Sequence, residues 1–194
     1  MNVTDRRKAQ LLMIKILKEV HRICTENNIK YFLHFGTLIG AVRHNGFIPW
    51  DDDIDVGMLR PDYERFLQIV KNKLGNDFIF QNSSNDRGFA YCFSKIMLKD
   101  TIWIEQSSVQ TSKKYNGIYI DVFPFDKVPA DENKRISFYE KCRLINYFTL
   151  CKYKINEQKM TDNHAVIKKL FVAIVPKFVF FHSKEFYLQK ILKS

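Results

Sequence analysis

The feature that most constrains this chain is the run Trp50-Asp51-Asp52-Asp53-Ile54-Asp55, which places four carboxylates within five residues. Carboxylates this close repel one another and destabilise a fold unless a cation neutralises them. Residues 53–58 alternate acidic and apolar side chains, which predicts a strand. On a strand, Asp51, Asp53 and Asp55 would share one face at intervals of roughly 7 Å. Because Mg²⁺ prefers carboxylate and phosphate oxygens, the run predicts a site for Mg²⁺ or Mn²⁺ in phosphoryl chemistry.

Two other interpretations of the acidic run deserve comparison. One is a solvated acidic turn, but the run follows Pro49-Trp50 and continues directly into an apolar strand. The other is a calcium loop of the EF-hand type, which requires Gly at its sixth position and Glu at its twelfth. Val56 and Asp62 occupy those positions here, so the EF-hand interpretation is rejected.

A second motif, Gly36-Thr37, lies between a predicted strand at 31–35 and a predicted short helix at 38–43. A helix N-terminus with a small hydroxyl residue offers backbone N–H groups to a phosphate, although a simple capped turn would look the same. Candidate partners for a nucleotide phosphate are Arg43, His44 and Lys95. A surface or loop-packing role is as plausible for His44.

A third acid, Asp121, lies inside the apolar strand predicted over 117–123. A carboxylate buried without a partner is costly, and a metal shared with Asp53 and Asp55 would explain it. A hydrogen-bonded structural aspartate is the alternative. Asp126, on the following loop, is expected to be structural.

Several aromatic residues and histidines are candidates for ligand contacts or for the core. His34 alternates within a predicted strand and is expected to be a core histidine. Four aromatic side chains could stack on a base or enclose a quaternary ammonium, with core packing as the default. They are Phe89, Trp103, Tyr115 and Tyr119.

The apolar pattern predicts helices over about 4–25 and from Pro61, and strands at 78–81, 89–98, 101–104 and 117–123. Basic amphipathic helices are predicted over 131–154 and 163–193. This order predicts an α+β fold with a mixed sheet flanked by helices and a helical C-terminal extension. The expected organisation is a catalytic domain over 1–130 and a basic helical region over 131–194.

The net charge of +10 is concentrated in the last third of the chain. Residues 1–126 hold 17 basic and 15 acidic residues, whereas residues 127–194 hold 14 and 6. Such an excess suits an anionic membrane surface, nucleic acid or an acidic substrate, or a solvated helix face. The four cysteines lie far apart and predict reduced core thiols. With no signal peptide and no apolar run of membrane-spanning length, a cytoplasmic protein is expected, located at the inner face of the cytoplasmic membrane if it makes peripheral contact there.

The segment HFGTLIGAVRHNGFIPWDDDIDVGM, with YIDVFPFD downstream, closely resembles the LicD family of bacterial phosphocholine transferases. This family is related to fukutin and fukutin-related protein, within the nucleotidyltransferase superfamily. The resemblance covers roughly residues 10–130. It implies a nucleotidyltransferase-like fold with Gly36-Thr37 at the donor site and Asp53, Asp55 and Asp121 as catalytic metal ligands, with Asp51 as an additional one. Family members usually continue into a C-terminal segment with a Tyr-Gly-Asp type motif, which this sequence lacks.

The resemblance further implies a reaction. Phosphocholine, or a related phospho-alcohol such as phosphoribitol, would move from CDP-choline or another CDP-alcohol to a sugar hydroxyl. The acceptor would be a lipid-linked surface glycan, either lipopolysaccharide or teichoic acid, and CMP would be released. Two alternatives stay open: an inactive LicD-like protein that binds nucleotide or glycan, and a basic nucleic-acid-binding module. The second leaves the acidic run unexplained, so nucleic acid is not an expected partner.

Overall fold

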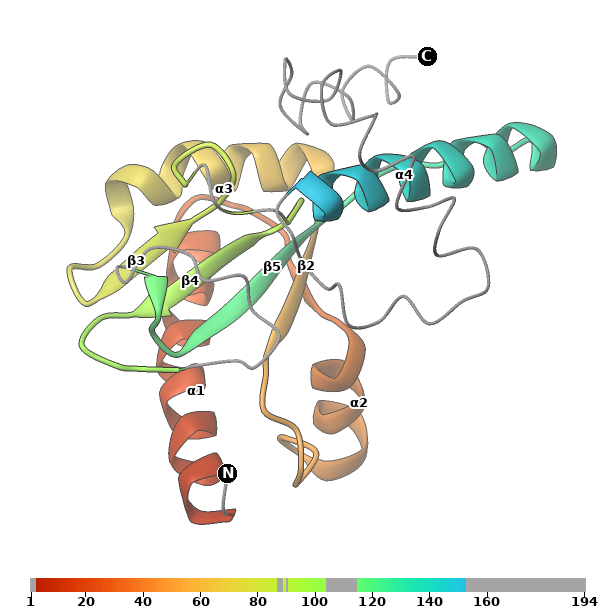
Figure 1. The fold of residues 1–194 in the computed structure, drawn as a ribbon. Helices are drawn as coiled ribbons and strands as arrows, with labels where there is room; N and C mark the ends of the chain where they lie inside the picture. The colour runs from red at the N-terminus through yellow and green to blue at the C-terminus, as the bar shows by residue number, and fades with distance from the viewer. Residues whose placement is uncertain (1–2, 87–88, 90, 104–114, 153–194) are drawn as a thin grey trace. The chain divides into compact units, whose positions relative to one another are not determined.

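The computed structural model describes residues 3–86, 89, 91–103 and 115–152, and these divide between two compact units. The first unit contains residues 1–104 and 111–126, and the second contains 105–110 and 127–194. In chain order, the elements of the first unit are α1 (Val3–Glu26), β1 (Phe32–Leu33), α2 (Phe35–His44), β2 (Asp55–Leu59), α3 (Arg60–Lys73), β3 (Phe78–Gln81), β4 (Ser94–Leu98) and β5 (Tyr119–Phe125) (Figure 1). The second unit contributes α4 (Glu132–Lys152).

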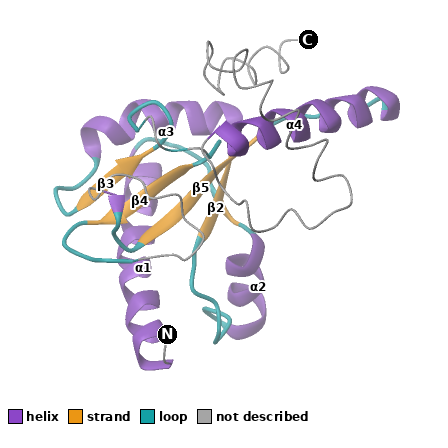
Figure 2. Cartoon of the chain, in the orientation of Figure 1, coloured by secondary structure: helices purple, strands orange, loops and turns teal. Residues whose placement is uncertain are grey.

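The strands form one five-stranded mixed sheet in the order β1-β2-β5-β4-β3. Figure 2 labels β2, β5, β4 and β3, which follow one another in this order. The two central strands that carry acids, β2 and β5, run parallel, and every other neighbouring pair is antiparallel. This arrangement confirms the predicted α+β fold with a mixed sheet and helices around it. It also brings residues 55 and 121, far apart in sequence, onto adjacent strands.

The two faces of the sheet have different side chains because alternate residues of a strand point in opposite directions. One face packs against α1 and α3, which also contact each other. That face is mostly apolar, with fully buried Val56, Met58, Ile96, Ile120 and Val122, and it also holds the buried Ser94. The opposite face carries the alternate residues, among them Asp55, Lys95 and Asp121. Chemistry is therefore confined to the face away from these two helices.

The helices form where the sequence predicts them. In α1 the buried stripe contains Met13, Ile16, Val20 and Ile23, at the three- and four-residue spacing of a helix face. In α3, Pro61 occupies the first turn, where its missing N–H group has no cost. The α3 residue Tyr63 reaches under the sheet, and its hydroxyl oxygen lies 2.6 Å from Ser94 Oγ.

Several predicted bounds are wrong. The first strand covers only Phe32–Leu33, because Phe35 already begins α2, whose range exceeds the predicted 38–43. The strand predicted from residue 53 begins at Asp55, and the strand predicted over 89–98 begins at Ser94. Residues 101–103 form no strand; the Thr101 hydroxyl instead donates to Leu98 O and accepts the Ile118 N–H. The Thr101 side chain thus takes up backbone hydrogen-bonding groups, and residues 101–103 form a loop although β-branched residues favour strands.

In the second unit, Asp131 caps α4, since its Oδ1 accepts the Lys134 N–H at 2.9 Å. This helix confirms the predicted helical character after residue 130, while the helix predicted over 163–193 lies outside the described residues. Among the described helices, none is both long and apolar enough to cross a membrane. The prediction of core thiols holds for buried Cys24, whereas Cys92 is exposed and Cys142 half-buried.

Gly40 allows α2 to pack against the loop that leads to the acidic run. A Cβ added to Gly40 would lie 2.5 Å from Gly46 O and 2.9 Å from Ile48 N, both backbone atoms.

We expect Gly40→Ala to lower the free energy of unfolding by about 1–2 kcal/mol in urea titrations, because overpacking outweighs the gain in helix propensity. Gly46→Ala is the matched control, since its nearest contact is 4.0 Å away. Equal stability of the two variants would contradict this packing.

Candidate active site

The start of α2 is joined to the start of β2 by two hydrogen bonds around Asp55. The Asp55 N–H donates to Thr37 Oγ1 at 2.9 Å, and the His34 N–H donates to Asp55 O at 3.0 Å. Both backbone polar groups of Asp55 are thus fixed by residues that border the N-terminus of α2. The Gly-Thr motif and the first strand acid therefore lie in direct contact, at the junction of α2 and β2.

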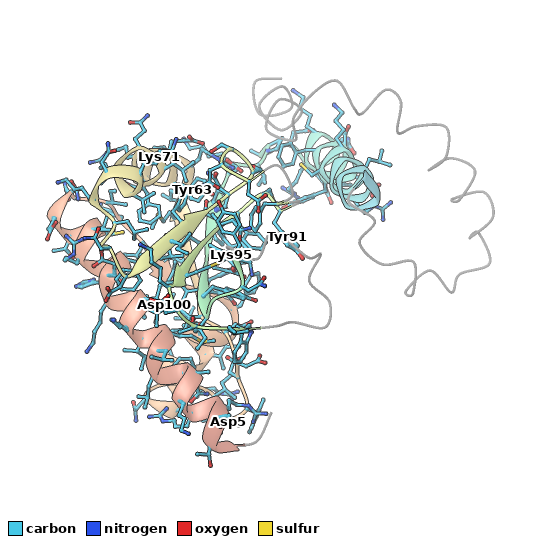
Figure 3. The ribbon with its side chains drawn as sticks, turned by 60° about the vertical axis from the view of Figure 1, so that its left-hand side comes forward. Asp5, Tyr63, Lys71, Tyr91, Lys95 and Asp100 are labelled. Atoms are coloured by element: carbon cyan, nitrogen blue, oxygen red, sulfur yellow. The ribbon has the colours of Figure 1, made fainter. Side chains whose placement is uncertain are left out.

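The register of three strands places Asp55, Asp121 and Lys95 side by side. Asp55 is the partner of Asp121 across the parallel pair, and Lys95 is the partner of Asp121 across the antiparallel pair. Partners in register point to the same face, so the three side chains form one row. The Lys95 Nζ lies 3.3 Å from Asp121 Oδ1, and the two side chains are only 10% and 14% exposed (Lys95 is labelled in Figure 3). The third acid therefore has a cation beside it.

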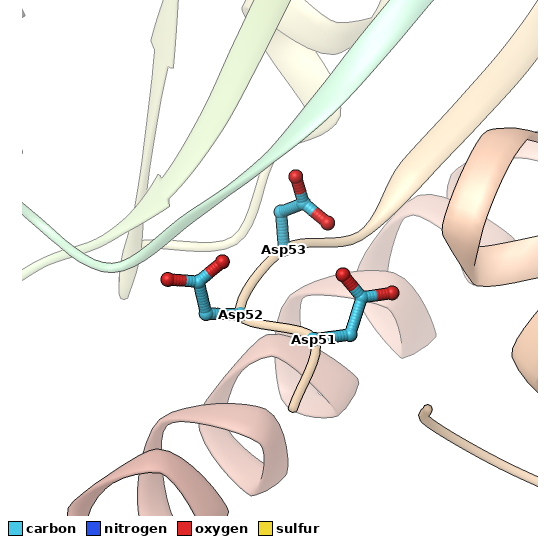
Figure 4. Close-up of side chains that lie close together, drawn as sticks. All are labelled: Asp51, Asp52 and Asp53. Atoms are coloured by element: carbon cyan, nitrogen blue, oxygen red, sulfur yellow. The ribbon is translucent and has the colours of Figure 1, made fainter. Parts of the chain in front are cut away.

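The remaining acids lie on the loop before β2. Carboxylate oxygens of Asp51, Asp52 and Asp53 lie within 4.8 Å of one another (Figure 4). Strand alternation therefore cannot account for the positions of Asp51 and Asp53, contrary to the sequence-based expectation. The loop is fixed instead by backbone contacts: the Asp51 N–H donates to Ile48 O at 3.0 Å, and Gln10 Nε2 donates to Asp51 O at 2.8 Å.

Gly36 is needed for the close approach of Asp51 to α2. A Cβ added to Gly36 would lie 2.6 Å from Asp51 Oδ2. The glycine of the Gly-Thr motif thus makes room for a carboxylate at the N-terminus of α2, where backbone N–H groups favour negative charge.

The acids of the site carry more negative charge than the neighbouring Lys95 compensates. Burial, followed by the negative charges of Asp51, Asp52 and Asp121, raises the pKa of Asp53 to about 6. Burial likewise raises the pKa of Asp55 to about 6, with contributions from Asp53 and Asp51 that exceed the opposing effect of Lys95. The acids of the loop and of the strands therefore act on one another as a single cluster.

These residues fit a hard divalent cation. Carboxylate oxygens are the ligands that Mg²⁺ and Mn²⁺ prefer, and the raised pKa values mark a site where a cation would be stabilising. The buried Asp51 Oδ2 also has no hydrogen-bond partner among the described residues. A metal held by Asp51, Asp53, Asp55 and Asp121 remains a proposal that this geometry supports.

Other predicted site residues lie farther from the acids. Arg43 and His44 are exposed in the last turn of α2. Arg43 follows Gly36 by seven residues, which corresponds to roughly 10 Å along a helix axis. The structure thus separates Arg43 from the Gly-Thr end of the helix, and the His44 ring instead lies near Trp50, at 6.5 Å between centroids.

The other candidates divide between core and site. Phe89 is buried and Trp103 packs against the core, whereas the Tyr119 ring lies beneath Lys95 Nζ, 3.2 Å from its centroid. His34 is half-buried among phenylalanine rings. Asp126 accepts two hydrogen bonds of 2.6 Å from Arg60, which agrees with its expected structural role.

The sequence-based reasoning missed two features of the site. Asp52, exposed on the loop, was omitted from the metal ligands because it alternates with them, although the loop gathers all three acids. The second is a group of aromatic side chains beside the acids, contributed by Phe35, Phe93 and Phe123. The sequence contains a signal for this group. Phe93 stands two residues from Lys95, and Phe123 stands two residues from Asp121, so on a strand each ring shares a face with its charged neighbour.

Comparison with known proteins defines the class to which this fold and site belong. Residues 28–149 match the family described as LicD/FKTN/FKRP, nucleotidyltransferase domain. The chain belongs to this family. It is 32% identical over 167 residues to the lipopolysaccharide cholinephosphotransferase LicD of Haemophilus influenzae, an alignment that covers 84% of this chain and 61% of that protein.

More distant similarity extends to animals. The chain is 29% identical over 97 residues to the ribitol 5-phosphate transferase FKRP of Homo sapiens, which covers 50% of this chain and 17% of that protein. An uncharacterized protein of Rickettsia prowazekii is 30% identical over 161 residues, covering 71% of this chain and 59% of that protein. The chain thus spans about three fifths of the length of each of these two bacterial proteins, LicD of Haemophilus influenzae and the uncharacterized protein of Rickettsia prowazekii.

The raised pKa values predict how stability depends on pH in metal-free protein. Because the folded pKa of Asp53 exceeds the ordinary value of 3.8, the folded state binds more protons than the unfolded chain between about pH 4 and 6. The free-energy cost of Asp53 therefore grows as the pH rises through this window and is complete above it. We expect Asp53→Asn to be more stable than the wild type at pH 7.5, by about 1 kcal/mol, because half-burial reduces the full effect, and nearly equal at pH 4.

Urea unfolding in EDTA across this pH range measures the difference between variant and wild type. Asp100→Asn, at an exposed residue outside the acidic run, is the control. A difference between Asp53→Asn and the wild type that stays constant with pH would contradict the electrostatic description of the cluster.

Proposed function

We propose that this protein transfers a phospho-alcohol, with phosphocholine as the first candidate, from a CDP-alcohol to a sugar hydroxyl of a cell-surface glycan. The proposal is supported by membership of the family and by the similarity to a lipopolysaccharide cholinephosphotransferase and a ribitol 5-phosphate transferase. The observation that carries it is that the register of β2 and β5 sets Asp55 beside Asp121, directly after the loop that gathers Asp51 and Asp53.

In this proposal, Mg²⁺ or Mn²⁺ is held by Asp53, Asp55 and Asp121, with Asp51 as a further ligand. When bound, the cation would neutralise diphosphate charge and align the reacting groups. The protein's own part is to fix these ligands. The hydrogen bonds of Thr37 and His34 hold the Asp55 backbone, and the Asp121 N–H donates to Ile54 O at 2.9 Å.

The donor phosphates are proposed to bind between the N-terminus of α2 and Lys95. The helix end offers the N–H groups of its first turn, including those of Gly36 and Thr37. Lys95 lies on the same row as Asp55 and would contact the diphosphate from the opposite side. Arg43 and His44 stay candidates for donor contacts at the far end of α2, where a longer ligand would reach them.

The proposed reaction is a single displacement at phosphorus. The sugar hydroxyl oxygen forms a bond to the phosphorus that bears the alcohol, and the bond from this phosphorus to the bridging oxygen breaks. CMP leaves with that oxygen and its electron pair. The hydroxyl proton passes to a carboxylate, for which Asp121 is our candidate by analogy with the superfamily.

The acceptor is proposed to be a lipid-linked glycan such as lipopolysaccharide or teichoic acid, used at the cytoplasmic face of the membrane. The excess of positive charge after residue 126 supports peripheral contact with anionic lipid. Ribitol phosphate is the second candidate for the transferred group, favoured by the similarity to FKRP.

The decisive test combines donor binding and turnover. Isothermal titration calorimetry should show that CDP-choline or CDP-ribitol binds more tightly with Mg²⁺ than with EDTA. Asp55→Asn and Asp121→Asn should each remove this metal effect and lower CMP release at least a hundredfold, because a buried ligand is lost. Asp100→Asn should behave as the wild type.

The outcomes separate the alternatives. Metal-dependent donor binding without CMP release, even with glycan acceptors present, would identify an inactive binding protein. Unchanged binding in Asp55→Asn would show that the metal site is misassigned.

A further inference from the structure

We propose that four aromatic side chains beside the acidic row form a subsite for a cationic quaternary ammonium head group on the donor. We call the set His34, Phe35, Phe93 and Phe123 the aromatic platform. The inference rests on the proposed function and specifies which donor alcohol the site selects. Quaternary ammonium groups bind to the faces of aromatic rings through the ring quadrupole.

The rings of the platform form a continuous set of contacts. Phe123 contacts Phe93 at 4.6 Å and Phe35 at 5.7 Å between centroids, and the His34 ring lies 3.7 Å from that of Phe35. These residues come from the start of α2, from β5 and from the residue before β4. Phe35 is 57% exposed, so the platform presents ring surface to a ligand.

The sheet register places the platform directly beside the acids. Phe123 follows Asp121 by two residues on β5 and therefore points to the same face. Phe93 stands opposite Phe123 when the β4–β5 register is extended by one residue, as Lys95 stands opposite Asp121. The next position of the same aromatic row, on β2, is Gly57, whose missing side chain leaves room for the Phe32 and Phe125 rings.

This spacing matches the length of the transferred group. The acidic row consists of Asp55, Asp121 and Lys95, and the aromatic row consists of Gly57, Phe123 and Phe93, two residues further along each strand. The two rows lie on one face of the sheet, about 7 Å apart. Four bonds separate phosphorus from nitrogen in phosphocholine, and the methyl groups extend beyond the nitrogen. An ammonium attached to a phosphate at the acidic row therefore reaches the rings of the next row.

Phe35 is held in a conformation that bulky residues rarely adopt. Its φ is 45°, in the left-handed region, which is a strained conformation for a residue other than glycine. Such strain persists where surrounding contacts fix it, and here the His34 and Phe123 rings do so. The strained backbone keeps an exposed ring over the sheet face at the point where α2 begins.

Charge complementarity favours a cation over a neutral polyol. The site contains five carboxylates at residues 51, 52, 53, 55 and 121, and its row contains one cation, Lys95. One divalent cation would leave the cluster net negative when all five are ionised, and the donor diphosphate adds more negative charge. A positively charged head group beside this cluster is therefore stabilised by the negative charge of the acids and by the ring faces, whereas neutral ribitol gains neither electrostatic contribution.

The test uses two donors of the same shape. CDP-choline is compared with its neutral analogue, in which a 3,3-dimethylbutyl group replaces choline, by calorimetry on the full chain with Mg²⁺. The wild type should bind CDP-choline at least tenfold more tightly than the analogue. Phe35→Leu and Phe123→Leu keep an apolar side chain but remove the ring, and each should reduce this ratio about three- to tenfold, mainly by weakening CDP-choline.

Val42→Ala is the control, since Val42 is an exposed apolar residue of the same helix, 74% exposed, outside the platform. It should leave the ratio unchanged, and circular dichroism melting confirms that each variant is folded. Phe35→Leu, at the more exposed position, keeps the test valid should Phe123→Leu unfold.

A ratio near one in the wild type, or a ratio that Phe35→Leu leaves unchanged, would overturn the subsite while metal-dependent binding of CDP-alcohols sustains the proposed function. Absence of metal-dependent binding of any CDP-alcohol would overturn both.

Discussion

The pairing of β2 with β5 is the constraint on which the site depends. These parallel strands place Asp55 opposite Asp121, and a one-residue slip would turn one of the two carboxylates into the apolar face that packs on α1 and α3. The fully buried Val56 and Val122 on that face fix the register, because neither can move to the polar face without exposing apolar surface. Core packing thus determines where the acids meet.

The same register explains how opposing charges are arranged. Lys95 on β4 lies against Asp121, while Asp55 borders the acidic loop and has no comparable neighbouring cation on β1. The negative charge is therefore concentrated between the loop and β2, where the pKa values of Asp53 and Asp55 are raised to about 6. This is a costly arrangement for a fold alone and an effective one for binding a cation.

Much of this fold follows from the sequence, because the helix stripes of α1 and α3 and the acid–apolar alternation of β2 are strong local signals. The acids themselves were also evident. The geometry of the loop was not evident, since Asp51 is placed by a long-range hydrogen bond from Gln10 and by the space that Gly36 leaves, rather than by strand alternation. The platform was missed for a similar reason: Phe35 was assigned to a strand, and its left-handed conformation at the start of α2 has no local sequence signal.

The central claim is that carboxylates from two strands and one loop form a single metal site. Crystals grown with Mn²⁺ and CDP-choline would test it through the anomalous scattering of manganese. The structure predicts a manganese peak within about 2.0–2.4 Å of oxygens from Asp55 and Asp121 and from at least one loop acid, Asp51 or Asp53. A peak bound only by Asp51, Asp52 and Asp53, with the strand acids uncoordinated, would contradict the claim.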